Sequence, residues 1–137
     1  MVARAAAATE LPVMRRTNEE VLRDHLELAR RGDWETDLAR NYTEDVVIIA
    51  SSGVFRGREG ARQEAARLLR DLPVTDYRYT CVRVVGDVGY LTWTAKGGGL
   101  EVRDGTDTYV FAEDGRIRAQ TFHYTVLDEQ GRVVAGE

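Results

Sequence analysis

The chain has 137 residues, of which 43% are hydrophobic and 31% are charged, a balance that is ordinary for a single globular domain. No stretch approaches the roughly 20 apolar residues of a membrane-spanning helix, so no membrane partner is expected. The formal net charge of -4 argues against a nucleic-acid partner, because proteins that bind nucleic acids usually carry a basic surface.

The N-terminal segment, residues 1–16, is predicted to be a flexible tail. Its run of four alanines is interrupted by Thr9 and Glu10 before the apolar core of a secretion signal can form, so a cytoplasmic location is expected. Residues 17–137 are expected to form one domain. The single cysteine, Cys81, excludes an internal disulfide and any metal site built from several cysteines.

Apolar residues at helical spacing predict three helices, over residues 17–31, 33–41 and 58–72. In the first helix, Thr17 and Glu20 have the spacing of a capping box, and Gly32 provides a C-terminal stop. Asp33 can cap the second helix. The arginines of the third helix are expected to lie on a solvated face, where they are balanced by Glu59, Glu64 and Asp71.

A run of mostly β-branched residues at 46–50 predicts a buried strand, followed by a short extended piece at 54–56. From residue 76 onward the apolar period is two, which predicts strands over residues 76–85, 88–95, 100–111 and 116–127. Three helices followed by a strongly curved antiparallel sheet make an α+β fold. We expect a cone-shaped barrel in which the sheet packs against the three N-terminal helices around an apolar pocket.

The segment from Gly32 to Leu69 has an order of elements that resembles the nuclear transport factor two-like superfamily. The residues that carry the resemblance are Gly32-Asp33, Tyr42-Thr43-Glu44-Asp45, Phe55-Arg56-Gly57 and Asp114-Gly115-Arg116-Ile117. The superfamily includes ketosteroid isomerases and SnoaL-like polyketide cyclases, and the similarity spans roughly Thr17 to Leu127. These residues mark turns and caps, so the resemblance indicates the fold more strongly than any one activity.

In ketosteroid isomerases of this fold, a carboxylate near the end of the first strand moves the proton. A tyrosine on the first helix and a protonated aspartate in a later strand hold the developing enolate. The resemblance places Ala50, His25 and Asp107 at these three positions. Because alanine cannot accept a proton, ketosteroid isomerase activity itself is not expected, and His25 and Asp107 are the expected catalytic residues.

His25 is predicted to lie on the apolar face of the first helix, where it is either a hydrogen-bond donor or base for a substrate, or a buried imidazole with one structural hydrogen bond. Asp107 shares strand parity with Tyr109 and Phe111, which predicts an inward carboxyl whose pKa is raised by desolvation. The alternatives are that a bulge at Gly105 turns Asp107 to water, or that Asp107 pairs with an arginine.

Aromatic and amide side chains are expected to line the pocket and bind a substrate, and they are Trp34, Tyr42, Tyr90, Tyr109, Gln120, Phe122 and Tyr124. Each aromatic residue among them is equally compatible with simple core packing. The parity of the last strand places His123 on the opposite face of the sheet, unless a bulge reverses it. A homodimer is expected through this outer face, with contributions from Trp93 and His123.

Two functions are compatible with these residues. The first is a cofactor-independent enzyme that uses acid-base chemistry, such as isomerisation, cyclisation, dehydration or epoxide opening, on a small, mostly apolar, oxygen-bearing and polyketide-like molecule. The second is a non-catalytic ligand-binding or dimeric assembly module. No metal site and no cofactor are expected, because the sequence contains no ligand spacing, dinucleotide fingerprint or phosphate loop.

Overall fold

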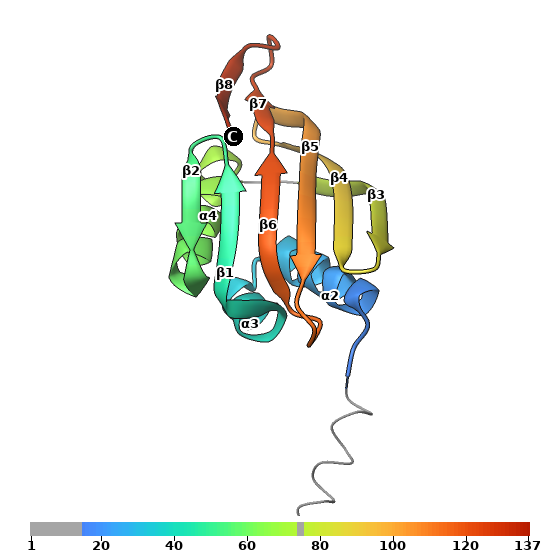
Figure 1. Ribbon diagram of the computed structural model, residues 1–137. Coiled ribbons are helices and arrows are strands. Elements are labelled where there is room, and N and C mark those ends of the chain that lie inside the picture. The colour runs from blue at the N-terminus through green and yellow to red at the C-terminus, as the bar shows by residue number, and fades with distance from the viewer. Residues whose placement is uncertain (1–14, 74–75) are drawn as a thin grey trace, which may run out of the picture.

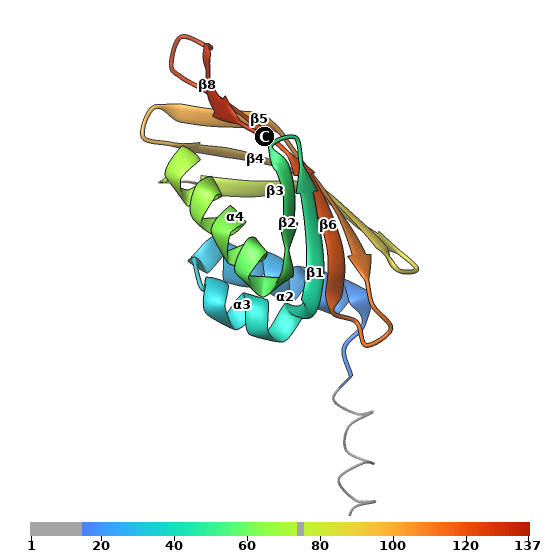
Figure 2. The ribbon, with the colours of Figure 1, turned by 60° about the vertical axis from the view of Figure 1, so that its left-hand side comes forward.

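The computed structural model describes residues 15–73 and 76–137, which form one curved sheet with three helices on its inner side (Figures 1 and 2). The helices are α2 (Asn18–Arg31), α3 (Trp34–Asn41) and α4 (Gly57–Asp71). The strands are β1 (Tyr42–Ala50), β2 (Gly53–Arg56), β3 (Asp76–Val85), β4 (Val88–Gly97), β5 (Leu100–Phe111), β6 (Ile117–His123), β7 (Thr125–Leu127) and β8 (Val133–Gly136). The predicted α+β architecture is confirmed.

The first two helices are fixed by caps that the sequence predicts. Thr17 and Glu20 form both hydrogen bonds of a capping box, at 3.1 and 2.8 Å. Gly32 ends α2 in the left-handed conformation, with a φ of 74°, and the side chain of Asp33 then accepts a hydrogen bond from the backbone of Thr36 at the start of α3. This short connection folds α3 back against α2.

The sheet has the strand order β2-β1-β6-β5-β4-β3, with β7 pairing to β5 and β8 pairing to β7. All of these pairs are antiparallel except β1 with β6, which are parallel, so the sheet is mixed where the sequence predicted an antiparallel one. The reason lies in the chain path. After β1 and β2 the chain crosses over through α4 to the far edge of the sheet, and the meander β3 to β6 then returns to β1 (Figure 1).

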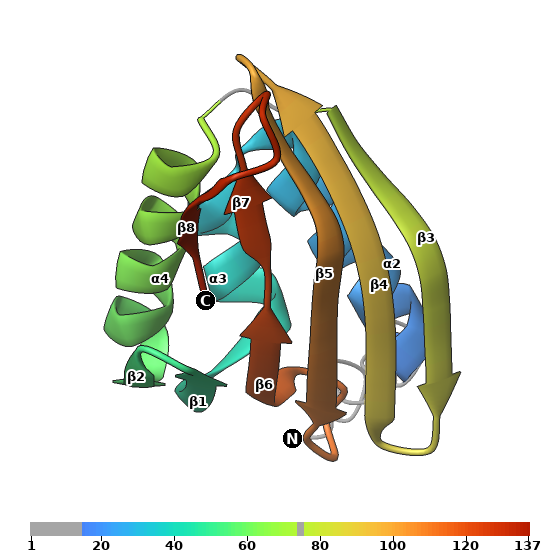
Figure 3. The same cartoon turned by 90° about the horizontal axis from the view of Figure 1, so that it is seen from above.

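The helices divide the inner side of the sheet between them. Figure 3 shows α4 over the β1–β2 end of the sheet and α2 toward the β3–β4 end, with α3 between them. The core residues lie between these layers, and Leu22, Val46, Val102 and Tyr109 are almost completely buried. Burial of apolar surface between helices and sheet supplies the main stabilising term of such a fold.

Most of the predicted N-terminal tail, residues 1–14, lies outside the described residues. Arg16 is described, and its guanidinium donates to Asn41 Oδ1 at 2.7 Å and lies 3.3 Å from Asp24 Oδ2. The chain is therefore attached to both α2 and α3 just before the first helix begins. Among the described helices, none combines the length and the apolar character needed to cross a membrane.

Candidate functional site

A cavity of about 110 Å³ lies between the helices and the inner face of the sheet. Its size is similar to that of cavities that hold one aromatic ring, which are about 150 Å³. Eight of the nine residues that the sequence analysis assigned to a site line this cavity, and they are His25, Trp34, Tyr42, Asp107, Tyr109, Gln120, Phe122 and Tyr124. They come from α2, α3, three strands and the link between β6 and β7, so the fold gathers residues that are up to 99 positions apart in the chain.

Tyr90 is the exception, and its assignment to the pocket is wrong. On β4 the buried residues are Gly89, Leu91 and Trp93, so Tyr90 points to the opposite face and is 44% exposed. Because side chains alternate along a strand, an aromatic residue at this position cannot face the cavity.

The same alternation corrects the placement of Trp93, which was expected at the outer face. Trp93 is 6% exposed and lines the cavity. It sits opposite Gly105 on β5, where an added Cβ would lie only 2.3 Å from the indole ring. Gly105 therefore leaves the space in which the indole lies, and the register of β4 against β5 directs Trp93 toward Asp107.

His123 is exposed on the outer side of the sheet, as the strand parity predicts. Its Nε2 lies 3.0 Å from Asp104 Oδ2, and the same carboxyl accepts hydrogen bonds from Thr125. His123 does not line the cavity.

Asp107 is the acceptor at the centre of the polar wall. Its side chain is buried and receives hydrogen bonds from Trp93 Nε1 at 2.8 Å, Gln120 Nε2 at 2.8 Å and the Tyr109 hydroxyl at 3.2 Å. The bulge near Gly105 does not turn it to water, and no arginine in residues 15–73 and 76–137 bonds to it. Burial raises the pKa of Asp107, and the three donors together with His25 offset only part of that rise.

Gln120 is held in the orientation that serves Asp107. The Tyr42 hydroxyl donates to Gln120 Oε1 at 2.7 Å, which leaves the amide nitrogen to donate to Asp107. Tyr42 and Gln120 are brought together by the parallel pairing of β1 with β6. The strand pairing that the sequence did not predict is thus the one that completes this side of the site.

His25 is bound on its other side by Asp37, a residue of α3 that the sequence analysis did not single out. His25 Nδ1 lies 2.7 Å from Asp37 Oδ2, and Asn41 donates to Asp37 Oδ1 at 2.9 Å. Because the carboxylate accepts, the shared proton belongs to Nδ1. Burial disfavours the imidazolium, but the charge and hydrogen bond of Asp37 and the charge of Asp107 outweigh burial and raise the pKa of His25.

The hydroxyl of Tyr109 joins the two predicted catalytic residues. It lies 3.2 Å from His25 Nε2 and 3.2 Å from Asp107 Oδ2, and it has only one proton to donate. When it donates to Asp107, His25 must be protonated on Nε2; when it donates to His25, the carboxyl of Asp107 must carry the proton. In both arrangements His25 and Asp107 together carry one proton, on one residue or the other, and the Tyr109 hydroxyl lies between them.

The network continues from Asp37 to the protein surface. Asn41 Nδ2 donates to Asp24 Oδ2 at 2.8 Å, and Arg40 makes two hydrogen bonds of 2.9 Å to the same carboxylate. Each of these residues lies on α2 or α3, so the caps that pair the two helices also fix the position of His25.

The sequence contained signals for three of the missed residues. Asp37 and Asn41 are polar and one helical turn apart, which indicates a shared face next to the predicted buried one. In β4, Leu91, Trp93 and Ala95 alternate with threonines, which indicates an inward Trp93. Within the described residues, no group of three or more histidine, cysteine, aspartate or glutamate side chains is arranged to hold a metal ion.

Comparison with known proteins identifies the family. The family model of the SnoaL-like domain matches residues 22–120, a segment that contains most of the fold and every residue of the buried network. The chain belongs to the SnoaL-like family. No curated protein sequence matches it.

Solved structures share the fold of this SnoaL-like domain at low sequence identity. A candidate ketosteroid isomerase from Kribbella flavida is 16% identical, with a TM-score of 0.67 over 81% of each chain. A candidate SnoaL-like polyketide cyclase from Jannaschia is 20% identical, with a TM-score of 0.64 over 78% of this chain and 84% of its own. A nuclear transport factor two-like protein of unknown function from Burkholderia xenovorans is 16% identical, with a TM-score of 0.66 over 78% of this chain and 81% of its own. These likenesses establish the fold and not an activity.

Proposed function

We propose that this SnoaL-like domain is a cofactor-independent enzyme that moves a proton on a small, mostly apolar, oxygen-bearing molecule. The observation that carries the proposal is the buried chain from Asp107 through Tyr109 to His25, placed on the wall of an otherwise largely apolar cavity. Perturbed titratable groups that converge on a cavity are characteristic of functional sites.

Each residue of the chain has a separate role in this proposal. Asp107 exchanges the proton with the bound molecule, and Trp93 and Gln120 hold its carboxyl in position. His25 stores the proton when Asp107 is ionised, and Asp37 stabilises the imidazolium while it does so. Tyr109 carries the proton between His25 and Asp107. The Asp107 carboxylate therefore regains its proton without access to water.

Isomerisation, cyclisation and dehydration all require a proton transfer next to a substrate oxygen, and this site suits any of them. The names of the Kribbella and Jannaschia proteins point to the same group of reactions. Ketosteroid isomerase activity is the least supported member, because Ala50 stands at the position of the proton carrier and does not line the cavity.

The proposal can be tested with a panel of one-ring and two-ring cyclic ketones in D₂O, in which the exchange of hydrogens next to the carbonyl is followed by NMR. We expect the protein to accelerate exchange in ketones that fit the cavity, and Asp107→Asn to slow it by about 100-fold or more. Asp104→Asn is the matched control, because Asp104 lies on the same strand but faces solvent. Equal rates for the native protein and Asp107→Asn would contradict the role of Asp107.

A non-catalytic ligand-binding module is the second candidate, and one observation favours it. The polar atoms of the network bond to one another, so these side chains have hydrogen-bond partners without a ligand. Tight binding of a ketone, measured by calorimetry, with no acceleration of hydrogen exchange would support this candidate over the enzyme.

We also propose that the domain forms a homodimer through the outer face of the sheet. Neighbouring strands there carry an apolar row made of Val47, Ala119, Val110, Val88 and Val85, in which Val85 is 79% exposed. Contiguous apolar side chains on a protein surface are typical of interaction sites. Light scattering at micromolar concentration should give twice the chain mass of 15.4 kDa, and a monomeric mass would contradict the proposal.

A further inference from the structure

Glu64 is a buried carboxyl that the network described above does not use. It lies on α4, lines the same cavity and is 6% exposed. Both of its carboxyl oxygens are buried with no hydrogen-bond partner in residues 15–73 and 76–137. Burial of an unpaired carboxyl costs free energy. Because Glu64 lies at a cavity wall, a molecule bound in the cavity can supply the missing hydrogen-bond partner.

The donors near Glu64 are engaged elsewhere. Arg67, one helical turn further along α4, lies 2.7 Å from Glu137 Oε2, and the Tyr124 hydroxyl donates to Asp71 at 2.8 Å. Glu137 is in turn held by Ser52, whose hydroxyl donates to it at 2.7 Å. These neighbouring side chains therefore bond to one another and not to Glu64, whose carboxyl faces the cavity.

We propose that Glu64 is a second proton-exchanging group of the site, which acts on a bound molecule from the helical wall of the cavity. Asp107 reaches the same cavity from β5 in the sheet, so the two carboxyls approach a ligand from different walls. The proposal rests on the proposed function and makes its substrate class narrower. The molecule has an apolar body with an oxygen at the Asp107 end and an acidic C–H or a second oxygen at the Glu64 end.

The charges around Glu64 suit this role. Burial is the main cause that raises the pKa of Glu64 to about 7, and the charge of Glu137 adds to it. Asp71 acts in the same direction, whereas Arg67 and Arg70 act against it. A carboxyl with such a pKa has both its acid and its base form populated at neutral pH, which is the condition for efficient proton transfer.

The probe for this proposal is 5-nitrobenzisoxazole, a planar and mostly apolar molecule with one acidic C–H. A carboxylate base removes the proton from C3, the C–H electron pair forms the nitrile, and the N–O bond breaks to release 2-cyano-4-nitrophenolate, which is coloured. The base then returns its proton to water. This reaction needs no cofactor and reports directly on a base inside an apolar cavity.

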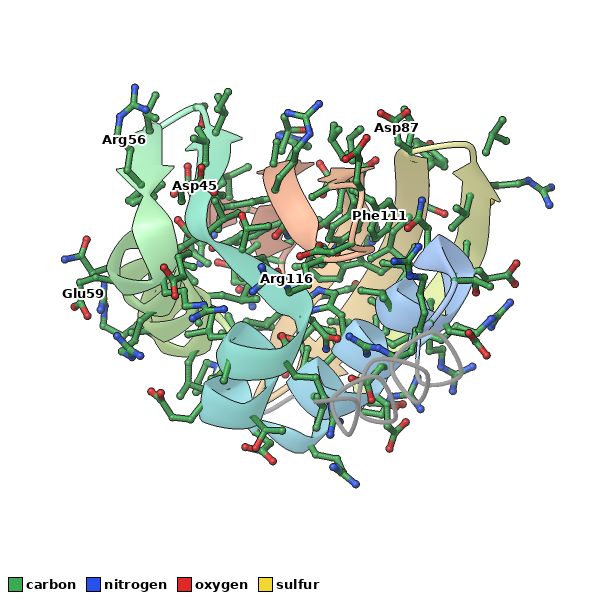
Figure 4. The ribbon with its side chains drawn as sticks, turned by 60° about the horizontal axis from the view of Figure 1, so that its bottom comes forward. Asp45, Arg56, Glu59, Asp87, Phe111 and Arg116 are labelled. Carbon is green, nitrogen blue, oxygen red and sulfur yellow. The ribbon has the colours of Figure 1, made fainter. Side chains whose placement is uncertain are left out.

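We expect the native protein to accelerate this elimination, with a rate that rises with pH through an inflection near 7. Glu64→Gln keeps the side-chain volume, removes the base, and should reduce the rate by about 100-fold and abolish the inflection. The matched control is Glu59→Gln, because Glu59 lies on the same helix but projects outward to Arg62 (Figure 4). Glu59→Gln should leave both the rate and the pH profile unchanged.

Asp107→Asn separates this proposal from the proposed function. When Asp107→Asn slows the ketone exchange and the elimination that remains keeps its inflection near 7, both assignments stand. When Glu64→Gln leaves the elimination unchanged, or the native protein does not accelerate it, the assignment of Glu64 is overturned while that of Asp107 is not. A ¹³C NMR titration of the native protein provides a test that does not require Glu64→Gln to fold. A Glu64 carboxyl that titrates near its ordinary pKa of 4.5 would also overturn the proposal.

Discussion

Tyr109 is the residue on which the buried network depends, because its single hydroxyl contacts both His25 and Asp107. Removal of that hydroxyl leaves two buried polar atoms short of a partner. Its ring also packs edge-on against the imidazole of His25, with ring centroids 5.4 Å apart. The ring and the hydroxyl therefore make separate contributions, which a conservative substitution can distinguish.

Tyr109→Phe should lower the free energy of unfolding by about 1–3 kcal/mol, because it removes the hydroxyl and leaves the ring in place. Urea unfolding measures this change. Tyr90→Phe removes a hydroxyl from an exposed ring and should change stability by less than about 0.5 kcal/mol. A loss for Tyr109→Phe no larger than that of Tyr90→Phe would mean that the hydroxyl is not part of a buried network.

Glu64 should make stability depend on pH. Its pKa of about 7 in the folded state lies above its ordinary value of 4.5, so between these values the folded state holds a proton that the unfolded chain has lost. The free energy of unfolding therefore decreases as pH rises from about 5 to 7, by roughly 2–3 kcal/mol from this group. In Glu64→Gln this part of the decrease should be absent. Parallel curves of unfolding free energy against pH for the two proteins would contradict the assignment.

At the scale of elements, the pair formed by β4 and β5 sets the polar wall. Trp93 and Gly105 lie opposite each other, and β5 carries one extra residue between Gly105 and Val102 relative to β4. This bulge and the missing side chain at Gly105 together let the indole reach Asp107.

Gly105→Ala should displace the indole, because the new Cβ would lie 2.3 Å from ring atoms. We expect a loss of stability of about 1–3 kcal/mol from this overpacking. Trp93→Ala costs stability as well, but the double variant should cost less than the sum of the two, since alanine at 93 leaves room for the Cβ. Additive losses in a double-mutant cycle would show that the two positions do not share this contact.

The elements differ in how far the sequence predicted them. Caps and stops, such as Thr17 and Gly32, act on residues next to them in the chain, so α2 and α3 were predicted with nearly correct ends. The pairing of β1 with β6 depends on which edges meet after the chain has passed through α4, and local pattern contains no such information. The strand β8 was not predicted, and the last predicted strand is divided into β6 and β7.

In the site, too, the sequence predicted what depends on neighbouring residues and missed what depends on contacts between distant elements. Helical face and strand parity were enough to place His25 and Asp107 on the inner side, and parity also excluded His123 from the cavity. The partners of these residues come from other elements, so Asp37 became visible only when α3 was packed against α2. Glu64 was expected to balance the arginines on a solvated face of its helix, whereas the packing of α4 turns it to the cavity.

At the scale of the whole molecule, the two faces of the sheet are available for different tasks. The inner face, with the helices, encloses the cavity and its proton-carrying groups, and the outer face carries the apolar row proposed for the dimer. Because strand side chains alternate between the faces, one set of strands serves both tasks.

We propose that His25 and Asp107 share one proton inside the domain. This proposal is tested by a ¹⁵N NMR titration of His25 in the native protein and in Asp107→Asn. Removal of the negative charge of Asp107 should lower the pKa of His25, because that charge raises it. A His25 titration that is identical in the native protein and in Asp107→Asn would contradict the account.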